Sequence, residues 1–119
     1  MFLKSTSSIP SFLAGDKTLL RELLHPKNDG LDLPFSIAHA SLAPQTASLA
    51  HRLQQDEWYY FLSGEGRLHC DDEVAEVKAG DLALIPAQSL QHVENTGSEA
   101  IIFLCIVCPA WTEEGEEIV

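Results

Sequence analysis

The stretch HRLQQDEWYYFLSGEGRL, residues 51–68, decides the fold of this chain of 119 residues. Its centre, Trp58–Leu62, is rich in aromatic residues, which favour β-strands. Gly64 and Gly66 follow as a turn signal, and a second short run begins at Arg67. The stretch therefore predicts two short strands joined by a glycine-containing turn.

The same alternation of short strands and turn residues continues on both sides of this stretch. Turn signals such as Pro44, Gly80-Asp81 and Asn95-Thr96-Gly97 separate the runs. Short strands at such even spacing are typical of an antiparallel sandwich or barrel. The strands expected are Phe35–Leu42, Ala47–Leu53, Trp58–Leu62, Arg67–Cys70, Val74–Val77, Leu82–Ile85, Gln91–Glu94 and Ala100–Val107.

The two ends of the chain have a different pattern. We expect residues 1–34 to form an N-terminal arm and lead-in, 35–110 a barrel, and 111–119 a solvated acidic tail. Within the arm, residues 16–24 fit a short helix capped by Asp16 and fit a strand equally well. Residues 26–34 are rich in turn residues and are expected to form a loop.

The charge of the chain is strongly negative, with 18 Asp and Glu against 7 Lys and Arg. Such a chain repels phosphate backbones and anionic lipids, so neither a nucleic acid nor a membrane is expected as partner. The longest apolar run, Ala100–Cys108, is far shorter than the roughly 20 residues that span a bilayer. The start of the chain lacks the apolar stretch of a secretory signal, and we expect a cytoplasmic protein.

Three cysteines, an odd number, argue against a disulfide framework. Cys105 and Cys108 form a CxxC, which a redox or metal site could use. Both lie in a predicted strand, where residues three apart point to opposite faces. We therefore expect small buried hydrophobes here rather than a redox pair.

Two segments resemble the motifs of the cupin superfamily. The first cupin motif has the pattern G-x5-H-x-H-x3-E-x6-G, and His51, Glu57 and Gly64 match it at the right separations. The second has the pattern G-x5-P-x-G-x2-H-x3-N. Its first Gly, its Pro and its Asn are matched here by Gly80, Pro86 and Asn95. The resemblance implies an all-β fold, the double-stranded β-helix or jelly-roll-type barrel.

The departures from these motifs lie at glycine and histidine positions. Gln45 and Gln88 stand where the motifs have Gly, and Leu53 and Gln91 stand where they have His. Two of the four usual metal ligands have therefore changed. The chain is also similar to single-domain bacterial cupins with an H-x-L-x3-E-x-YY pattern, most of which have no assigned activity.

Carried over to this sequence, the resemblance implies a metal site formed by His51, Glu57 and Gln91, with Leu53 in the fourth place. A mixed nitrogen and oxygen set of this kind suits Mn, Fe, Ni or Zn with several waters. Gln91 and His92 cannot both face inward on a regular strand. The cupin spacing favours Gln91 inward with Glu94 in water, and a β-bulge would reverse that choice.

Other residues are candidates for contact with a ligand. Tyr59 and Phe61 share a strand face with Glu57 and fit either core or pocket lining. Leu53 and His92 complete the ligand-binding set, and Tyr59 or His92 would be the acid–base group of an enzyme.

Three functions remain open at this point. The first is a metal-dependent enzyme acting on a small molecule, with no reaction specified. The second is a ligand-binding or sensor protein with a metal-poor pocket, and the third is a purely structural domain. A homodimer is expected, with the apolar segment 19–24 as its contact.

Overall fold

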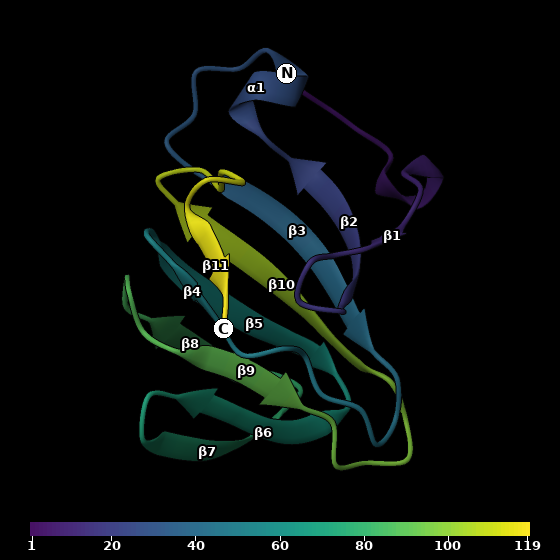
Figure 1. The fold of residues 1–119 in the computed structure, drawn as a ribbon. Coiled ribbons are helices and arrows are strands. Elements are labelled where there is room, and N and C mark those ends of the chain that lie inside the picture. The colour runs from purple at the N-terminus through teal and green to yellow at the C-terminus, as the bar shows by residue number, and fades with distance from the viewer.

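The computed structural model describes residues 1–119 as two antiparallel sheets with a shared apolar core between them (Figure 1). The predicted all-β class is thereby confirmed. The six-stranded sheet has the order β1 (Phe12–Leu13), β2 (Leu19–Leu24), β3 (Ser36–Leu42), β10 (Ile101–Cys108), β5 (Asp56–Ser63) and β8 (Leu82–Ile85). The five-stranded sheet has the order β11 (Glu116–Ile118), β4 (His51–Leu53), β9 (Gln91–Glu94), β6 (Glu65–Cys70) and β7 (Glu73–Lys78).

The segment left open between helix and strand is a strand. β2 pairs with β3 in antiparallel register, with Leu20 opposite Ala40. The expected strand from Ala47 begins only at His51. The expected loop over 26–34 contains one helical turn, α1 (Pro26–Asp29), because Pro26 suits the first helical position and Gly30 ends the turn with a φ of 64°. A 3₁₀ turn, η1 (Thr6–Ser8), precedes β1.

Both ends of the chain belong to the sheets. The tail is not the free terminus that the sequence suggested, because β11 pairs with β4 and places Glu116 opposite Leu53, although Glu117 and Ile118 remain exposed to solvent. Two flanking backbone hydrogen bonds hold it there, from Gln54 N to the Gly115 carbonyl and from Val119 N to the Ala50 carbonyl, each 2.9 Å long. At the other end, the apolar residues 19–24 are already bonded within the chain as β2.

Inward side chains change character along the central strands β3, β5 and β10. At one end they are large or fully buried and form the core, where the Phe61 and Phe103 rings lie 5.5 Å apart. Toward the other end the inward positions are smaller or polar: Ser36 and Ala38 on β3, Glu57 on β5, and Cys105 and Val107 on β10. The core therefore fills one half of the barrel and leaves a cavity in the other.

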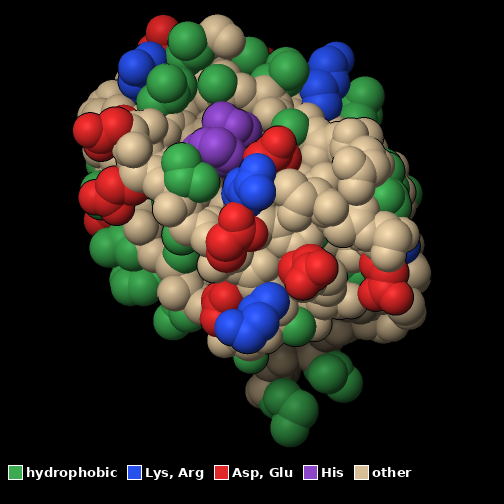
Figure 2. Space-filling model, turned by 90° about the horizontal axis from the view of Figure 1, so that it is seen from below, with side chains coloured by type: hydrophobic (Ala, Val, Ile, Leu, Met, Phe, Trp, Pro, Cys, Tyr) green, Lys and Arg blue, Asp and Glu red, His purple; other side chains and the backbone are tan.

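The surface carries the acidic excess of the composition, a formal net charge of -11. On the face seen in Figure 2, acidic side chains are spread widely, the basic ones lie apart from one another, and no continuous basic patch is visible there. No helix of the chain combines the length and the hydropathy that crossing a bilayer would demand.

Candidate ligand cavity and metal-binding cluster

The cavity in the open half of the barrel has a volume of about 140 Å³ and is lined by 22 residues, 12 of them hydrophobic. A protein cavity of about 150 Å³ accommodates benzene. This cavity is therefore large enough for one six-membered ring. Tyr59 and Phe103, whose ring centroids lie 5.3 Å apart, line it on the side of the core.

Four carboxyl groups line the cavity, and no Lys or Arg does. They belong to Asp16, Glu22, Glu57 and Glu116. The basic side chains in the cavity wall are two histidines, His25 and His51. His25 Nε2 is hydrogen-bonded to the Trp111 carbonyl at 2.7 Å. The electrostatic potential of the cavity therefore disfavours the binding of an anion.

Glu57 is the most perturbed of these carboxyl groups. Its residue is 5% exposed, and its buried Oε1 has no hydrogen-bond partner. Burial, together with the charge of Asp16, raises the pKa of Glu57 from 4.5 to about 8, and the nearby Cys105, Tyr59 and Gln91 side chains oppose this only in part. Glu57 is therefore protonated at neutral pH.

Gln91 lies behind the cavity wall. It is 1% exposed, and its Oε1 accepts a hydrogen bond from the Tyr59 hydroxyl. Burial and the neighbouring Glu57 raise the pKa of Tyr59 well above 10, so this hydroxyl keeps its proton. Gln91 thus orients Tyr59 and does not itself line the cavity.

The register expected for β9 is confirmed, with Gln91 and Val93 buried and His92 and Glu94 partly exposed. His92 therefore does not line the cavity and cannot act as its acid–base group. Its ring instead stacks on His69 of the paired strand, with centroids 4.0 Å apart. Burial, followed by the charge of His69, lowers the pKa of His92.

The remaining expected contacts divide between cavity and core. Tyr59 and Leu53 line the cavity, whereas Phe61 is fully buried in the core and does not. The CxxC cysteines are free and lie on opposite strand faces: Cys105 is buried as expected, whereas Cys108 is exposed, so the expectation that both are buried is wrong for Cys108. Burial raises the pKa of Cys105 well above 9, so its thiol stays protonated.

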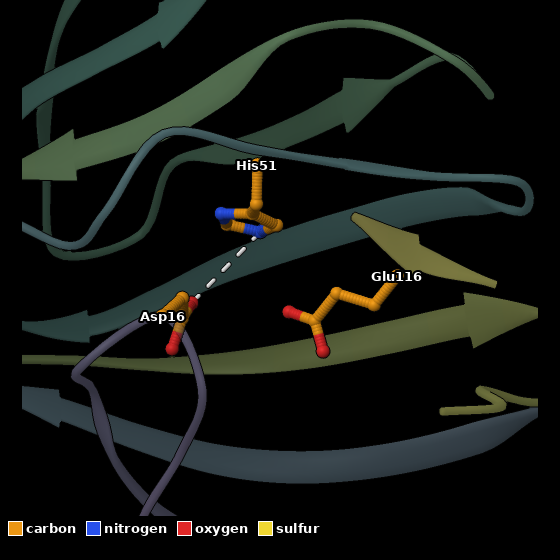
Figure 3. A group of neighbouring side chains, drawn as sticks. All are labelled: Asp16, His51 and Glu116. Carbon is orange, nitrogen blue, oxygen red and sulfur yellow. Dashed lines mark ion pairs between the residues drawn. The ribbon is translucent and has the colours of Figure 1, made fainter. Parts of the chain in front are cut away.

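His51 lies with two carboxylates that sequence reasoning did not select (Figure 3). Asp16 comes from the turn between β1 and β2, and Glu116 opens β11. One donor atom from each of the three residues lies within 4.8 Å of the others, and His51 Nε2 is 3.8 Å from Asp16 Oδ2. The sequence carried no local signal for this cluster, because Asp16 fitted a helix cap and Glu116 fitted a solvated tail.

The fold and the cavity define a class: a small antiparallel β-barrel of two sheets with a ligand-sized cavity at one end. The chain belongs to the cupin family, since the cupin domain profile matches residues 38–107. This confirms the resemblance carried by the two motifs.

Proteins similar to this chain include an uncharacterized protein, an oxalate-binding protein and a polyketide cyclase. An uncharacterized protein of Methanocaldococcus jannaschii is 34% identical over 111 residues, which cover 92% of this chain and 88% of that protein. An oxalate-binding protein of Thermotoga maritima is 31% identical over 71 residues, 59% of each chain. The structure of the polyketide cyclase RemF from Streptomyces resistomycificus superposes with a TM-score of 0.79 at 19% identity, covering 91% of this chain and 79% of that one. At that identity the similarity to the cyclase concerns the fold alone.

Proposed function

We propose that the barrel cavity binds a small, largely apolar molecule that is uncharged or cationic. The observation that carries this proposal is the unpartnered Oε1 of Glu57, buried in a mostly apolar cavity. A buried polar atom without a partner costs about 1–3 kcal/mol, and a ligand that supplies a hydrogen-bond donor would recover part of that cost.

The charge of the cavity restricts the ligand further. An anion would have to approach Asp16 and Glu116 with no Lys or Arg nearby to compensate its charge. Protonated Glu57 can donate one hydrogen bond and accept another, which suits a hydroxyl, an amide or an amine. Without a bound cation, a dicarboxylate such as oxalate, which the name of the Thermotoga maritima relative mentions, does not suit this cavity.

A thermal-shift screen with matched ligands tests this selectivity. Benzyl alcohol, benzylamine and benzoate share one ring and differ in charge. We expect the alcohol and the amine to stabilise the chelator-treated protein, by about 1.4 kcal/mol at ten times Kd, and benzoate and oxalate to have no such effect. Ala38→Leu is the matched variant: Ala38 lines the cavity, and the larger side chain would fill part of its volume and should abolish the thermal shifts. Stabilisation mainly by the anions, or equal shifts in Ala38→Leu, would contradict the proposal.

Acid–base chemistry on the bound ligand is a second candidate function. It is favoured by the position of Glu57, whose side chain lines the cavity and has one unpartnered carboxyl oxygen and a pKa of about 8. A group with a pKa near the working pH is an effective proton donor and acceptor. No particular reaction follows from this.

The metal set implied by the motifs, His51, Glu57 and Gln91 with Mn, Fe, Ni or Zn, is poorly suited to hold an ion. Leu53 offers no atom that could bind a metal, and the Oε1 of Gln91 already accepts a hydrogen bond from the Tyr59 hydroxyl. His51 and Glu57 would remain as two donors, whereas catalytic zinc sites use three protein ligands. Any metal in this barrel therefore needs donors from elsewhere in the chain.

For the partner of the chain we propose a second copy, docked through the outer face of β5 and β8. Trp58 lies opposite Leu84 and Tyr60 opposite Leu82, and their exposed fractions run from 37% to 61%. Contiguous exposed apolar patches of this kind mark interaction sites. The four side chains are uncharged, so two copies of this acidic chain can meet there without opposing carboxylates.

Light scattering tests this dimer. We expect the chain of 13.1 kDa to behave as a dimer and the double variant Leu82→Glu, Leu84→Glu as a folded monomer, because like charges would face each other across the interface. Val74→Glu is the control, since Val74 is 57% exposed but lies on β7 of the other sheet. A monomeric native chain, or a double variant that stays dimeric, would rule the interface out.

A further inference from the structure

The strongest unassigned feature is the cluster of Asp16, His51 and Glu116 at the cavity wall. Two donors bound about 2.1 Å from a shared ion lie no more than about 4.2 Å apart. The 3.8 Å between His51 Nε2 and Asp16 Oδ2 already meets that limit, and all donor atoms lie within 4.8 Å. In Figure 3 the Glu116 carboxylate points toward the other two groups.

The His51 ring is held in the state that a metal ligand needs. His51 is 3% exposed, and its Nδ1 lies 2.8 Å from the Leu49 carbonyl oxygen. A carbonyl only accepts, so Nδ1 carries the proton, and in the neutral ring Nε2 presents its lone pair. Nε2 has no hydrogen-bond partner, its nearest polar neighbour being Asp16 at 3.8 Å. A histidine oriented by a backbone carbonyl with the other nitrogen free is the usual arrangement in metal sites.

The Asp16 carboxylate is positioned in a similar way. Its Oδ1 accepts from Thr18 N at 3.1 Å and from Thr18 Oγ1 at 2.7 Å. Thr18 is itself 2% exposed, so this contact is fixed by packing. Oδ2 is the oxygen that remains, and it is the one directed at His51.

We propose that Asp16, His51 and Glu116 bind a divalent first-row transition ion. One imidazole nitrogen and two carboxylate oxygens suit Zn²⁺, Mn²⁺ or Fe²⁺, whereas Cu(I) prefers sulfur ligands and Mg²⁺ prefers oxygen alone. Only His51 is shared with the set implied by the family motifs. The other two ligands come from the terminal segments.

An ion at this place would join the two terminal segments of the chain to β4. Asp16 precedes β2, His51 opens β4 and Glu116 opens β11, so one ion would connect both ends of the chain to the barrel. β11 is a strand of three residues at a sheet edge and is bonded only to β4. Binding of the ion should therefore slow the opening of β11 and raise the Tm.

The test uses the full chain, purified without an affinity tag and freed of metal with a chelator. We titrate Zn²⁺ and Mn²⁺ by calorimetry, with Mg²⁺ for comparison, and follow amide hydrogen exchange in β11. We expect one Zn²⁺ or Mn²⁺ per chain, weaker binding of Mg²⁺, and slower exchange in β11. Asp16→Asn and Glu116→Gln should each weaken binding at least tenfold.

Two control variants locate the site. Glu117→Gln changes the exposed neighbour of Glu116 on the same strand, and Glu57→Gln removes the carboxylate of the motif-derived set. Glu117→Gln should bind the ion as the native chain does, and Glu57→Gln should still take up one ion per chain, because Glu57 is not among the three proposed ligands. The proposal is overturned if no ion binds, if Asp16→Asn and Glu116→Gln bind normally, or if Glu57→Gln alone abolishes binding.

Amide exchange in β11 of the native chain decides the outcome should a variant fail to fold, since unchanged exchange on metal addition also overturns the proposal. Ligand binding to the cavity is measured in chelator-treated protein, so its failure is separate from failure of this site.

Discussion

Glu57→Gln is expected to raise the free energy of unfolding at pH 9 by about 3–5 kcal/mol. Burial raises the pKa of Glu57 from 4.5 to about 8, and each pH unit of that difference corresponds to about 1.36 kcal/mol. The full difference would give about 5 kcal/mol, and the burial of an amide in place of a neutral acid reduces it. Few single substitutions stabilise a protein this much.

The direction of the pH dependence follows from which state holds the proton. Below pH 4.5 Glu57 is protonated in both the folded and the unfolded chain, and burial of this side chain costs the least stability there. Between pH 4.5 and about 8 the unfolded chain releases the proton while the folded chain retains it, so stability falls as pH rises. Above about pH 8 both states are ionised, and this loss is complete.

Urea unfolding of the native chain and of Glu57→Gln at pH 4.5, 6, 7.5 and 9 measures this effect. The difference in stability between them should grow across this range and level off at the top. Glu73→Gln on β7 is the control, because Glu73 is exposed and its replacement should leave the pH profile unchanged. Parallel profiles for the native chain and Glu57→Gln would show that the folded Glu57 is ionised at neutral pH.

The strands of the barrel could be predicted because their inward positions alternate. On β5 the inward residues Glu57, Tyr59 and Phe61 are all buried, and the residues between them are exposed. On β9 the alternation left two registers open, and the cupin spacing from Pro86 and Asn95 correctly placed Gln91 inside and His92 outside. Local alternation is sufficient wherever one sheet face meets the core.

Alternation does not say how far along the barrel a residue lies. Tyr59 and Phe61 share one face, yet Tyr59 lines the cavity and Phe61 is in the core. The difference depends on what the opposite sheet places there. For that reason the sequence left both residues open between core and pocket.

The cluster of Asp16, His51 and Glu116 depends on contacts that bring both ends of the chain to β4 and the residue Leu49 before it. Asp16 reaches His51 because the Asp16 carbonyl accepts a 2.7 Å hydrogen bond from Leu49 N, and Glu116 reaches it because β11 pairs with β4. These pairings join residues far apart in sequence, and no local pattern encodes them. A short acidic tail and a possible helix cap were therefore the natural interpretations from sequence alone.

Gly66→Ala is expected to cost about 3 kcal/mol or more of stability. The sequence suggested a turn role for Gly66, but it lies within β6, where no positive φ requires glycine. The requirement is space, because a Cβ at this position would lie 2.2 Å from the backbone oxygen of Glu94 and 3.3 Å from Ile101 Cδ1. Relief requires β6 and β9 to separate, and overpacking that moves backbone costs about 1–3 kcal/mol or more.

Gly97→Ala is the matched control for this substitution. Gly97 lies in the loop after β9, and the nearest atoms that its Cβ would meet are 3.5 Å away, which is ordinary contact. Urea unfolding should therefore give nearly native stability for Gly97→Ala and a large loss for Gly66→Ala. Equal stability of the two variants would mean that β9 moves away from β6 at little cost.

The backbone displacement caused by Gly66→Ala should also reach the barrel cavity. β6 and β9 are paired from Arg67 opposite Glu94 to Cys70 opposite Gln91, so displacement of β9 at one end shifts Gln91 at the other. Gln91 accepts the hydrogen bond that orients Tyr59, and Tyr59 lines the cavity. At a temperature where Gly66→Ala is still folded, we therefore expect weaker binding of benzyl alcohol than in Gly97→Ala, because β9 is pushed away from β6 and carries Gln91 with it.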